Sequence, residues 1–157
     1  MTEQELRAKN KETVEKYFQL HGAARLELFA EDGAKIIPFN PTAHTAFEWR
    51  GKEHLKANFE FNAKDLSTWE FTGMEVHPFL DPNFFLVKAS GHGVHADGSV
   101  YENSYLFTIR LRDGLITELC EYMNPVNGLT ASGMEVPKDL LWSEEKMSGM
   151  GAREVKK

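Results

Sequence analysis

Two Asp-Gly pairs, Asp97-Gly98 and Asp113-Gly114, divide the second half of the chain into strand-length runs. An Asp-Gly pair favours a tight β-hairpin, because both central positions of a type I′ turn need a positive φ. The runs between such turns are rich in aromatic and β-branched residues and cover 69–79, 84–95, 100–112 and 115–123. The sequence therefore predicts an antiparallel meander of four strands in this half.

The first half shows helical periodicity instead. From Thr2 to His21, apolar residues recur at helical spacing, and Glu and Lys fill the positions between them. We expect further helices over 23–29, 51–66 and 136–146, short strands over 34–38 and 47–50, a turn at 31–33 and a loop over 40–45. Helices followed by a meander predict an α+β fold.

Composition and charge limit the class of protein. The chain has 157 residues, of which 41% are hydrophobic and 27% are charged, which is typical of one soluble domain. We expect this domain to span residues 1–147 and a flexible tail to follow over 148–157. The net charge of -6 and the lack of a basic run argue against a nucleic-acid partner.

The sequence also predicts a cytoplasmic protein. The polar start of the chain does not look like a signal peptide, and no apolar run approaches the length of a membrane span. The single cysteine, Cys120, fits a reducing compartment, and we expect it to be a small core residue.

No metal or cofactor is expected. His92 and His95 are three apart on a predicted strand, so they point to opposite faces, and the other histidines lie in different elements. Gly91-His92-Gly93 is followed by no helix and by no Gly-Lys-Ser/Thr ending, so it is not a nucleotide loop.

The best candidate for chemistry is Glu121. It alternates with apolar residues on the last predicted strand, so it shares a face with Leu119 and Met123. A carboxyl group held among apolar side chains keeps its proton more tightly, which suits it to general acid or base catalysis. A surface or salt-bridged glutamate is the alternative interpretation.

Two-residue turns at both Asp-Gly pairs would fix the neighbours of Glu121. Leu106 would then lie opposite it, and its face would be floored by Ala89, Gly91 and Gly93, whose small volume leaves room for a ligand. The expected substrate-binding residues are Ser104, Leu106, Thr108, Gly91, Trp69, and the helical neighbours Asn58 and Asn62. Core packing of Trp69 and surface exposure of the two asparagines are the alternatives. The other face, with His92, Asn103, Tyr105, Phe107, Ile109, Ile116, Cys120 and Tyr122, would form an oligomer interface.

Several segments resemble the phenazine biosynthesis PhzA/PhzB family, within the nuclear-transport-factor-2-like (SnoaL-like) superfamily. They run in a consistent order from about residue 5 to 140: 6–10, 13–17, 28–33, 50–52, 81–84, 91–93, 101–103, 113–114, 121–124 and 136–137. The resemblance implies a cone-shaped, cystatin-like fold in which N-terminal helices pack on a curved antiparallel sheet. It also implies a cytoplasmic homodimer.

The function implied by the resemblance is the condensation of two amino-oxocyclohexene carboxylates through paired imine formation. The family carboxylate that positions and protonates the reacting species falls on Glu121. The family's pocket histidine and serine fall on Asn58 and Asn62, which can hydrogen-bond a substrate but cannot transfer its protons. Two alternatives stay open: a SnoaL-like or ketosteroid-isomerase-like isomerase or cyclase acting on a cyclic ketone, and a non-catalytic protein that binds a small ligand.

Overall fold

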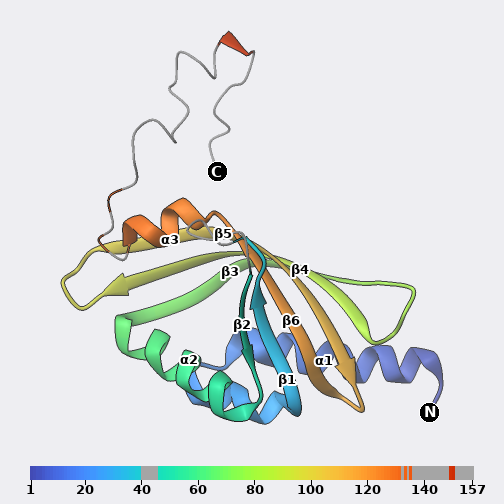
Figure 1. Cartoon of the computed structure of the whole chain (residues 1–157). Coiled ribbons are helices and arrows are strands. Elements are labelled where there is room, and N and C mark those ends of the chain that lie inside the picture. The colour runs from blue at the N-terminus through green and yellow to red at the C-terminus, as the bar shows by residue number, and fades with distance from the viewer. Residues whose placement is uncertain (40–45, 132, 134, 136–148, 151–157) are drawn as a thin grey trace.

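The computed structural model describes residues 1–39, 46–131, 133, 135 and 149–150 (Figure 1). Its centre is one six-stranded sheet with the strand order β2-β1-β6-β5-β4-β3. The strands are β1 (Phe29–Ile37), β2 (Phe47–Arg50), β3 (Leu66–Pro78), β4 (Phe84–His95), β5 (Val100–Arg112) and β6 (Leu115–Met123). The predicted loop over 40–45, the predicted helix over 136–146 and most of the predicted tail over 148–157 lie outside the described residues.

The predicted meander is confirmed. Strands β3, β4, β5 and β6 pair in sequence order and antiparallel, and three of them have the predicted bounds. The curved sheet differs from the expected antiparallel one at a single pairing, because β1 pairs parallel with β6 and the sheet is therefore mixed. Strands that are distant in sequence carry no turn between them, so periodicity gives no information about their relative direction.

The two longer helices lie together on one side of the curved sheet, and the last helix lies at its other end (Figure 1). Helix α1 (Glu3–Gln19) begins with a capping box, in which Thr2 accepts from the Glu5 backbone N–H and the Glu5 side chain accepts from that of Thr2. The 3₁₀ helix η1 (Gly22–Leu28) and helix α2 (Lys52–Asp65) follow, and α3 (Pro125–Ala131) comes after β6. Within the described part of the chain, no helix is long and apolar enough to cross a membrane.

The core fills the space between these helices and the inner face of the sheet. Phe18 of α1 packs edge-to-face on Phe107 of β5, with ring centroids 5.0 Å apart. Tyr17 of α1 contacts Phe59 of α2, so large rings also join the two helices. Fully buried members of the core include Val14, Tyr17, Phe29, Leu55, Phe85, Val87, Phe107, Ile109, Ile116 and Leu119.

Strand β1 begins earlier than predicted. The predicted turn at 31–33 lies inside β1, and the pairing of β1 with β6 shifts between Phe29 and Ala34. Gly33 makes this irregularity possible, because a Cβ there would lie 2.8 Å from the Ile116 carbonyl oxygen and 2.9 Å from that of Ala30. The turn-like residues Glu31, Asp32 and Gly33 therefore mark a bulged strand.

The predicted register of β5 is wrong by one residue against both of its neighbours. Between β4 and β5, the His95 N–H donates to the Ser99 carbonyl, so the loop has three residues and Gly98 adopts a φ of 85°. Between β5 and β6, the two-residue turn does form at Asp113 and Gly114, which have φ values of 55° and 80°.

An irregularity beyond this second turn changes the pairing. Leu111 lies opposite Ile116, but Arg110 lies opposite Glu118, so Thr117 is an extra residue in β6. As a result Phe107, and not Leu106, lies opposite Glu121.

Because of these two one-residue shifts, the side chains of β5 lie on the opposite faces from those predicted. For β4 the two shifts cancel, so its side chains keep their predicted faces relative to β6. Ala89, Gly91 and Gly93 share the inner face with Glu121 as predicted, because Ala89 pairs with Tyr105, and Tyr105 with Met123.

The oligomer interface predicted on the opposite face is wrong for five of its residues. Asn103, Tyr105, Phe107, Ile109 and Ile116 are buried in the interior.

The low-volume floor of glycines is occupied by a side chain of the protein itself. A Cβ on Gly91 would lie 2.4 Å from Cη2 of Trp69 and 2.7 Å from Cε2 of Tyr105, and one on Gly93 would lie 2.8 Å from Cε3 of Trp69. The indole of Trp69 therefore rests on the glycines of β4 and takes the space that the sequence predicted for a ligand.

We expect Gly91→Ala to lower the free energy of unfolding by about 1–3 kcal/mol, because the added methyl group overlaps two rigid rings. Urea denaturation measures this change. Gly128→Ala is the matched control, since its Cβ would meet only Met123 Cε, at 3.9 Å, and should change stability little. Equal stability of the Gly91 variant and the wild type would contradict this packing.

Candidate functional site

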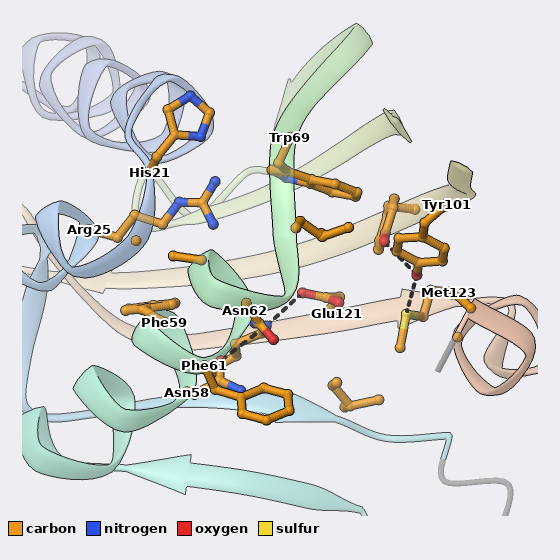
Figure 2. A pocket seen from close by; sticks show the side chains of 18 of the residues that line it. His21, Arg25, Asn58, Phe59, Phe61, Asn62, Trp69, Tyr101, Glu121 and Met123 are labelled. Atoms are coloured by element: carbon orange, nitrogen blue, oxygen red, sulfur yellow. Dashed lines mark hydrogen bonds and ion pairs between the residues drawn. The ribbon is translucent and has the colours of Figure 1, made fainter. Parts of the chain in front are cut away.

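A cavity of about 1020 Å³ lies between the inner face of the sheet and the helices η1 and α2 (Figure 2). Four of the predicted site residues line it: Glu121, Asn58, Asn62 and Trp69. Gly91 supports the ring of Trp69 from beneath. The volume is at the upper end of the range for small-molecule sites, so the cavity has room for two six-membered rings.

The other three predicted binding residues lie elsewhere, because the register of β5 differs from the predicted one. Ser104 and Leu106 line a second hollow of about 520 Å³, together with Tyr122 and residues of β3 and β4. Leu106 is 39% exposed, and Thr108 lines neither hollow. The structure therefore does not bring Ser104, Leu106 and Thr108 together with Glu121.

A buried ion pair occupies the wall of the cavity. Nζ of Lys35 on β1 lies 3.1 Å from Oε2 of Glu121 on β6, and the two residues are only 5% and 9% exposed. The same ammonium donates to Oδ1 of Asn58 on α2, 3.4 Å away, and lies 5.7 Å from the centre of the Trp49 ring. Three elements that are distant in sequence thus meet at one polar point.

The ion pair affects the pKa of Lys35. Burial lowers the pKa of Lys35, but the charge of Glu121, the nearby Tyr17 and the hydrogen bond to Glu121 together raise it by more, so the pKa lies above its usual value. Lys35 is therefore an ammonium across the neutral range, and it pairs with Glu121. This is the salt-bridged alternative for Glu121, in a buried setting.

Arg25 of η1 presents an unpaired nitrogen at the cavity (Figure 2). Its Nε donates to the carbonyl oxygens of Tyr17 and Leu20, at 3.1 Å and 2.8 Å, and its guanidinium lies 4.7 Å from the Tyr17 ring centre. One terminal nitrogen is buried without a hydrogen-bond partner, and no carboxylate of a described residue pairs with Arg25. An unpaired buried guanidinium nitrogen is suited to bind an anion.

Two tyrosines form a further polar group in the same cavity. The hydroxyl oxygens of Tyr101 and Tyr105 lie 2.9 Å apart, and Nδ2 of Asn103 donates to Tyr101 at 3.0 Å. Burial raises the pKa of both hydroxyls, so both keep their protons. In Figure 2, Tyr101 and Arg25 lie on opposite sides of the cavity, with Glu121 between them.

Sequence reasoning did not find Lys35, Arg25 and the tyrosine pair. Lys35 stands between Ala34 and Ile36 on a predicted strand, where alternation alone is equally consistent with an exposed lysine. Arg25 lies in a short amphipathic segment with no motif. Tyr105 and Asn103 were assigned to the opposite face because of the shifted register.

The described residues contain no group of three His, Cys, Asp or Glu side chains that could hold a metal ion. Cys120 is a free thiol and is buried, as expected for a core residue.

Comparison with known proteins identifies the family. Residues 1–141 match the family described as phenazine biosynthesis protein A/B. Phenazine biosynthesis protein PhzB1 of Pseudomonas aeruginosa is 36% identical over 142 residues, which cover 85% of this chain and 86% of that protein.

Solved structures agree with this assignment. The crystal structure of the phenazine biosynthesis-related protein PhzB2 of Pseudomonas aeruginosa has a TM-score of 0.78 and 34% identity, covering 90% of this chain and 95% of that one. An NTF2-like protein of Burkholderia xenovorans, 23% identical, shares the fold with a TM-score of 0.62 over 79% of this chain and 95% of its own. The fold is thus nuclear-transport-factor-2-like, and the chain belongs to the phenazine biosynthesis protein A/B family.

Proposed function

We propose that this protein binds small cyclic keto acids that carry an amine and promotes their condensation into a tricycle, with Glu121 transferring the protons. The proposal rests on the placement of Glu121 and Arg25 in one large cavity. The first offers a carboxylate for proton transfer, and the second offers an unpaired cation for the substrate's carboxylate.

The charges of the cavity favour a monoanion. Lys35 and Glu121 neutralise each other at 3.1 Å, so the remaining net charge is that of Arg25. A cyclic carboxylate can place its charged group on the guanidinium and its ring against Trp69, Phe59 and Phe71, which line the same space.

Imine formation needs protons to move from nitrogen to oxygen. When the amine of one molecule attacks the ketone of another, a C–N bond forms and the carbonyl oxygen takes up a proton. A second proton then leaves the nitrogen as the hydroxyl departs as water. The Glu121 carboxylate can accept each proton from nitrogen and return it to oxygen, so it ends unchanged and no oxidant is consumed.

The two asparagines are proposed as orienting amides. Asn58 is 8% exposed and its oxygen accepts from Lys35, so its nitrogen is left to donate to a substrate. Asn62 lies one helical turn further along α2 and lines the same cavity. Neither amide exchanges a proton near neutral pH, so neither can replace Glu121 in the proposed proton transfer.

We also propose that the protein is a cytoplasmic homodimer that pairs through the outer face of its sheet. Leu106 is 39% exposed there, and Tyr122 lines the smaller hollow together with it. Apolar side chains gathered on a sheet face are common at dimer interfaces.

An isomerase or cyclase acting on a cyclic ketone is the second candidate. The pairing with Lys35 gives Glu121 the charge of a general base, which could remove a proton next to a carbonyl group. Mass spectrometry after incubation with an amino-oxocyclohexene carboxylate separates the readings. A tricyclic product supports condensation, deuterium exchange without coupling supports an isomerase, and an unchanged bound ligand supports a binding protein.

Glu121→Gln is expected to reduce formation of the tricyclic product about 10²–10⁴-fold, because an amide cannot carry the protons. Ligand affinity should change only a few-fold. Glu118→Gln is the matched control, since Glu118 lies on the same strand and pairs with Arg110 at the surface. Full activity of the Glu121 variant in a chromatographic product assay would exclude Glu121 as the proton carrier.

Arg25→Met is expected to weaken the binding of cyclohexanecarboxylate about 10–100-fold, because it removes a charge-assisted hydrogen bond to the carboxylate. Isothermal titration calorimetry measures this affinity. Arg112→Met removes a surface arginine that pairs with Asp32, and it should leave the affinity unchanged. Equal affinity of the Arg25 variant and the wild type would rule out the proposed carboxylate site.

Lys35→Met is expected to destabilise the fold by about 3–5 kcal/mol, because it leaves the Glu121 carboxylate buried without a cation. The double variant Lys35→Met/Glu121→Leu should be more stable than Lys35→Met alone, because no charge stays buried. Lys88→Met breaks an exposed pair with Glu75 and serves as the control. Denaturant unfolding of the four proteins checks this coupling, which is refuted if the two Lys35 variants are equally unstable.

A further inference from the structure

The hydrogen bonds around Asn103 fix the direction of a chain of donors that ends in the cavity. Oδ1 of Asn103 accepts from the backbone N–H groups of Ser104 and Asn124, at 2.9 Å and 3.1 Å. Only one end of an amide accepts, so the other end of this side chain must be the NH₂ group. That group donates to the Asn124 carbonyl at 2.9 Å and to the Tyr101 hydroxyl at 3.0 Å.

Tyr101 must therefore accept from Asn103 and send its own proton elsewhere. Two acceptors are within reach: the Tyr105 oxygen at 2.9 Å and the Met123 sulfur at 3.7 Å. The oxygen is closer and is the stronger acceptor, because a thioether sulfur is only a weak one. The favoured chain thus runs from Asn103 to Tyr101 to Tyr105.

This direction leaves the proton of Tyr105 without an acceptor in the described part of the chain. Tyr105 is 5% exposed and lines the cavity that Glu121 and Tyr101 also line. A hydroxyl that already accepts one hydrogen bond is polarised into a better donor. Trp69 stacks on Tyr101 with ring centroids 5.8 Å apart, and this holds the second member of the chain in place.

We infer that the Tyr105 hydroxyl binds the carbonyl oxygen of the substrate, and that Asn103 and Tyr101 are positioning residues that direct its proton into the cavity. This inference rests on the proposed function, since a cyclic keto acid is the ligand that presents such an oxygen. A substrate held by its carboxylate at Arg25 would extend past Glu121 toward Tyr101 on the far side (Figure 2). Its carbonyl oxygen gains negative charge when the amine attacks, and a fixed donor stabilises that charge.

The test compares two probes, 3-oxocyclohexanecarboxylate and cyclohexanecarboxylate, which differ only in the carbonyl oxygen. The ratio of their dissociation constants, measured by isothermal titration calorimetry, isolates the contribution of that oxygen. Tyr105→Phe is expected to reduce the preference for the keto acid about five- to tenfold, because it removes the donor. Tyr101→Phe keeps the donor but removes its orientation, so we expect a loss of about two- to threefold.

Tyr122→Phe is the matched control, because Tyr122 lies on the same sheet but lines the outer hollow, and it should leave the preference unchanged. Thermal unfolding confirms that each variant is folded. An unchanged preference in Tyr105→Phe, or an equal loss for both probes, would overturn the inference.

The Arg25→Met experiment tests the proposed function separately from the inference about Tyr105. If that variant binds cyclohexanecarboxylate as tightly as the wild type, the proposed carboxylate site fails, while the preference between the probes still reports on Tyr105. Binding of neither probe to the wild type would overturn both.

Discussion

The ion pair between Lys35 and Glu121 places two full charges in the buried wall of the cavity, and the arrangement of three elements depends on it. Moving both groups out of water carries a large desolvation penalty, which attraction offsets only when the charges are close and their other hydrogen bonds are made. A separation of 3.1 Å and the additional acceptor on Asn58 meet these conditions. Apolar residues of similar volume would stabilise a fold at least as well, so a role in the chemistry of the cavity explains the pair better than stability does.

Two irregular strands allow the pair to form. The shift in β1 before Ala34 sets Lys35 opposite Leu119, and the extra residue at Thr117 sets Glu121 opposite Phe107. Without the extra residue, Glu121 would share its face with Leu106 and would lose Tyr105 as a neighbour. The polar cavity is thus a consequence of where the sheet departs from regular pairing, and bulges often lie beside functional sites for this reason.

The elements themselves were largely predictable, because they depend on local patterns. Strands 84–95, 100–112 and 115–123 have the predicted bounds, and the predicted third helix over 51–66 corresponds to α2. The face of β5 was not predictable, because an Asp-Gly pair is compatible with a loop of two or three residues and nothing near Thr117 marks a bulge. Lys35 was missed for a different reason, because its partner is about ninety residues away along the chain. The two residues lie on strands that pair in parallel, and no turn in the sequence indicates such a pairing.

Several polar groups of the cavity cannot carry protons near neutral pH. Asn58, Asn62 and the two tyrosine hydroxyls keep their protons near neutral pH, and Lys35 stays charged beside Glu121. None of these groups can return a proton that Glu121 takes from a substrate, whereas the Glu121 carboxylate itself can. Such a site favours reactions in which the donor and acceptor atoms both reach one pair of oxygens. The transfer from nitrogen to the neighbouring oxygen of a carbinolamine meets this condition, because both atoms are bonded to the same carbon.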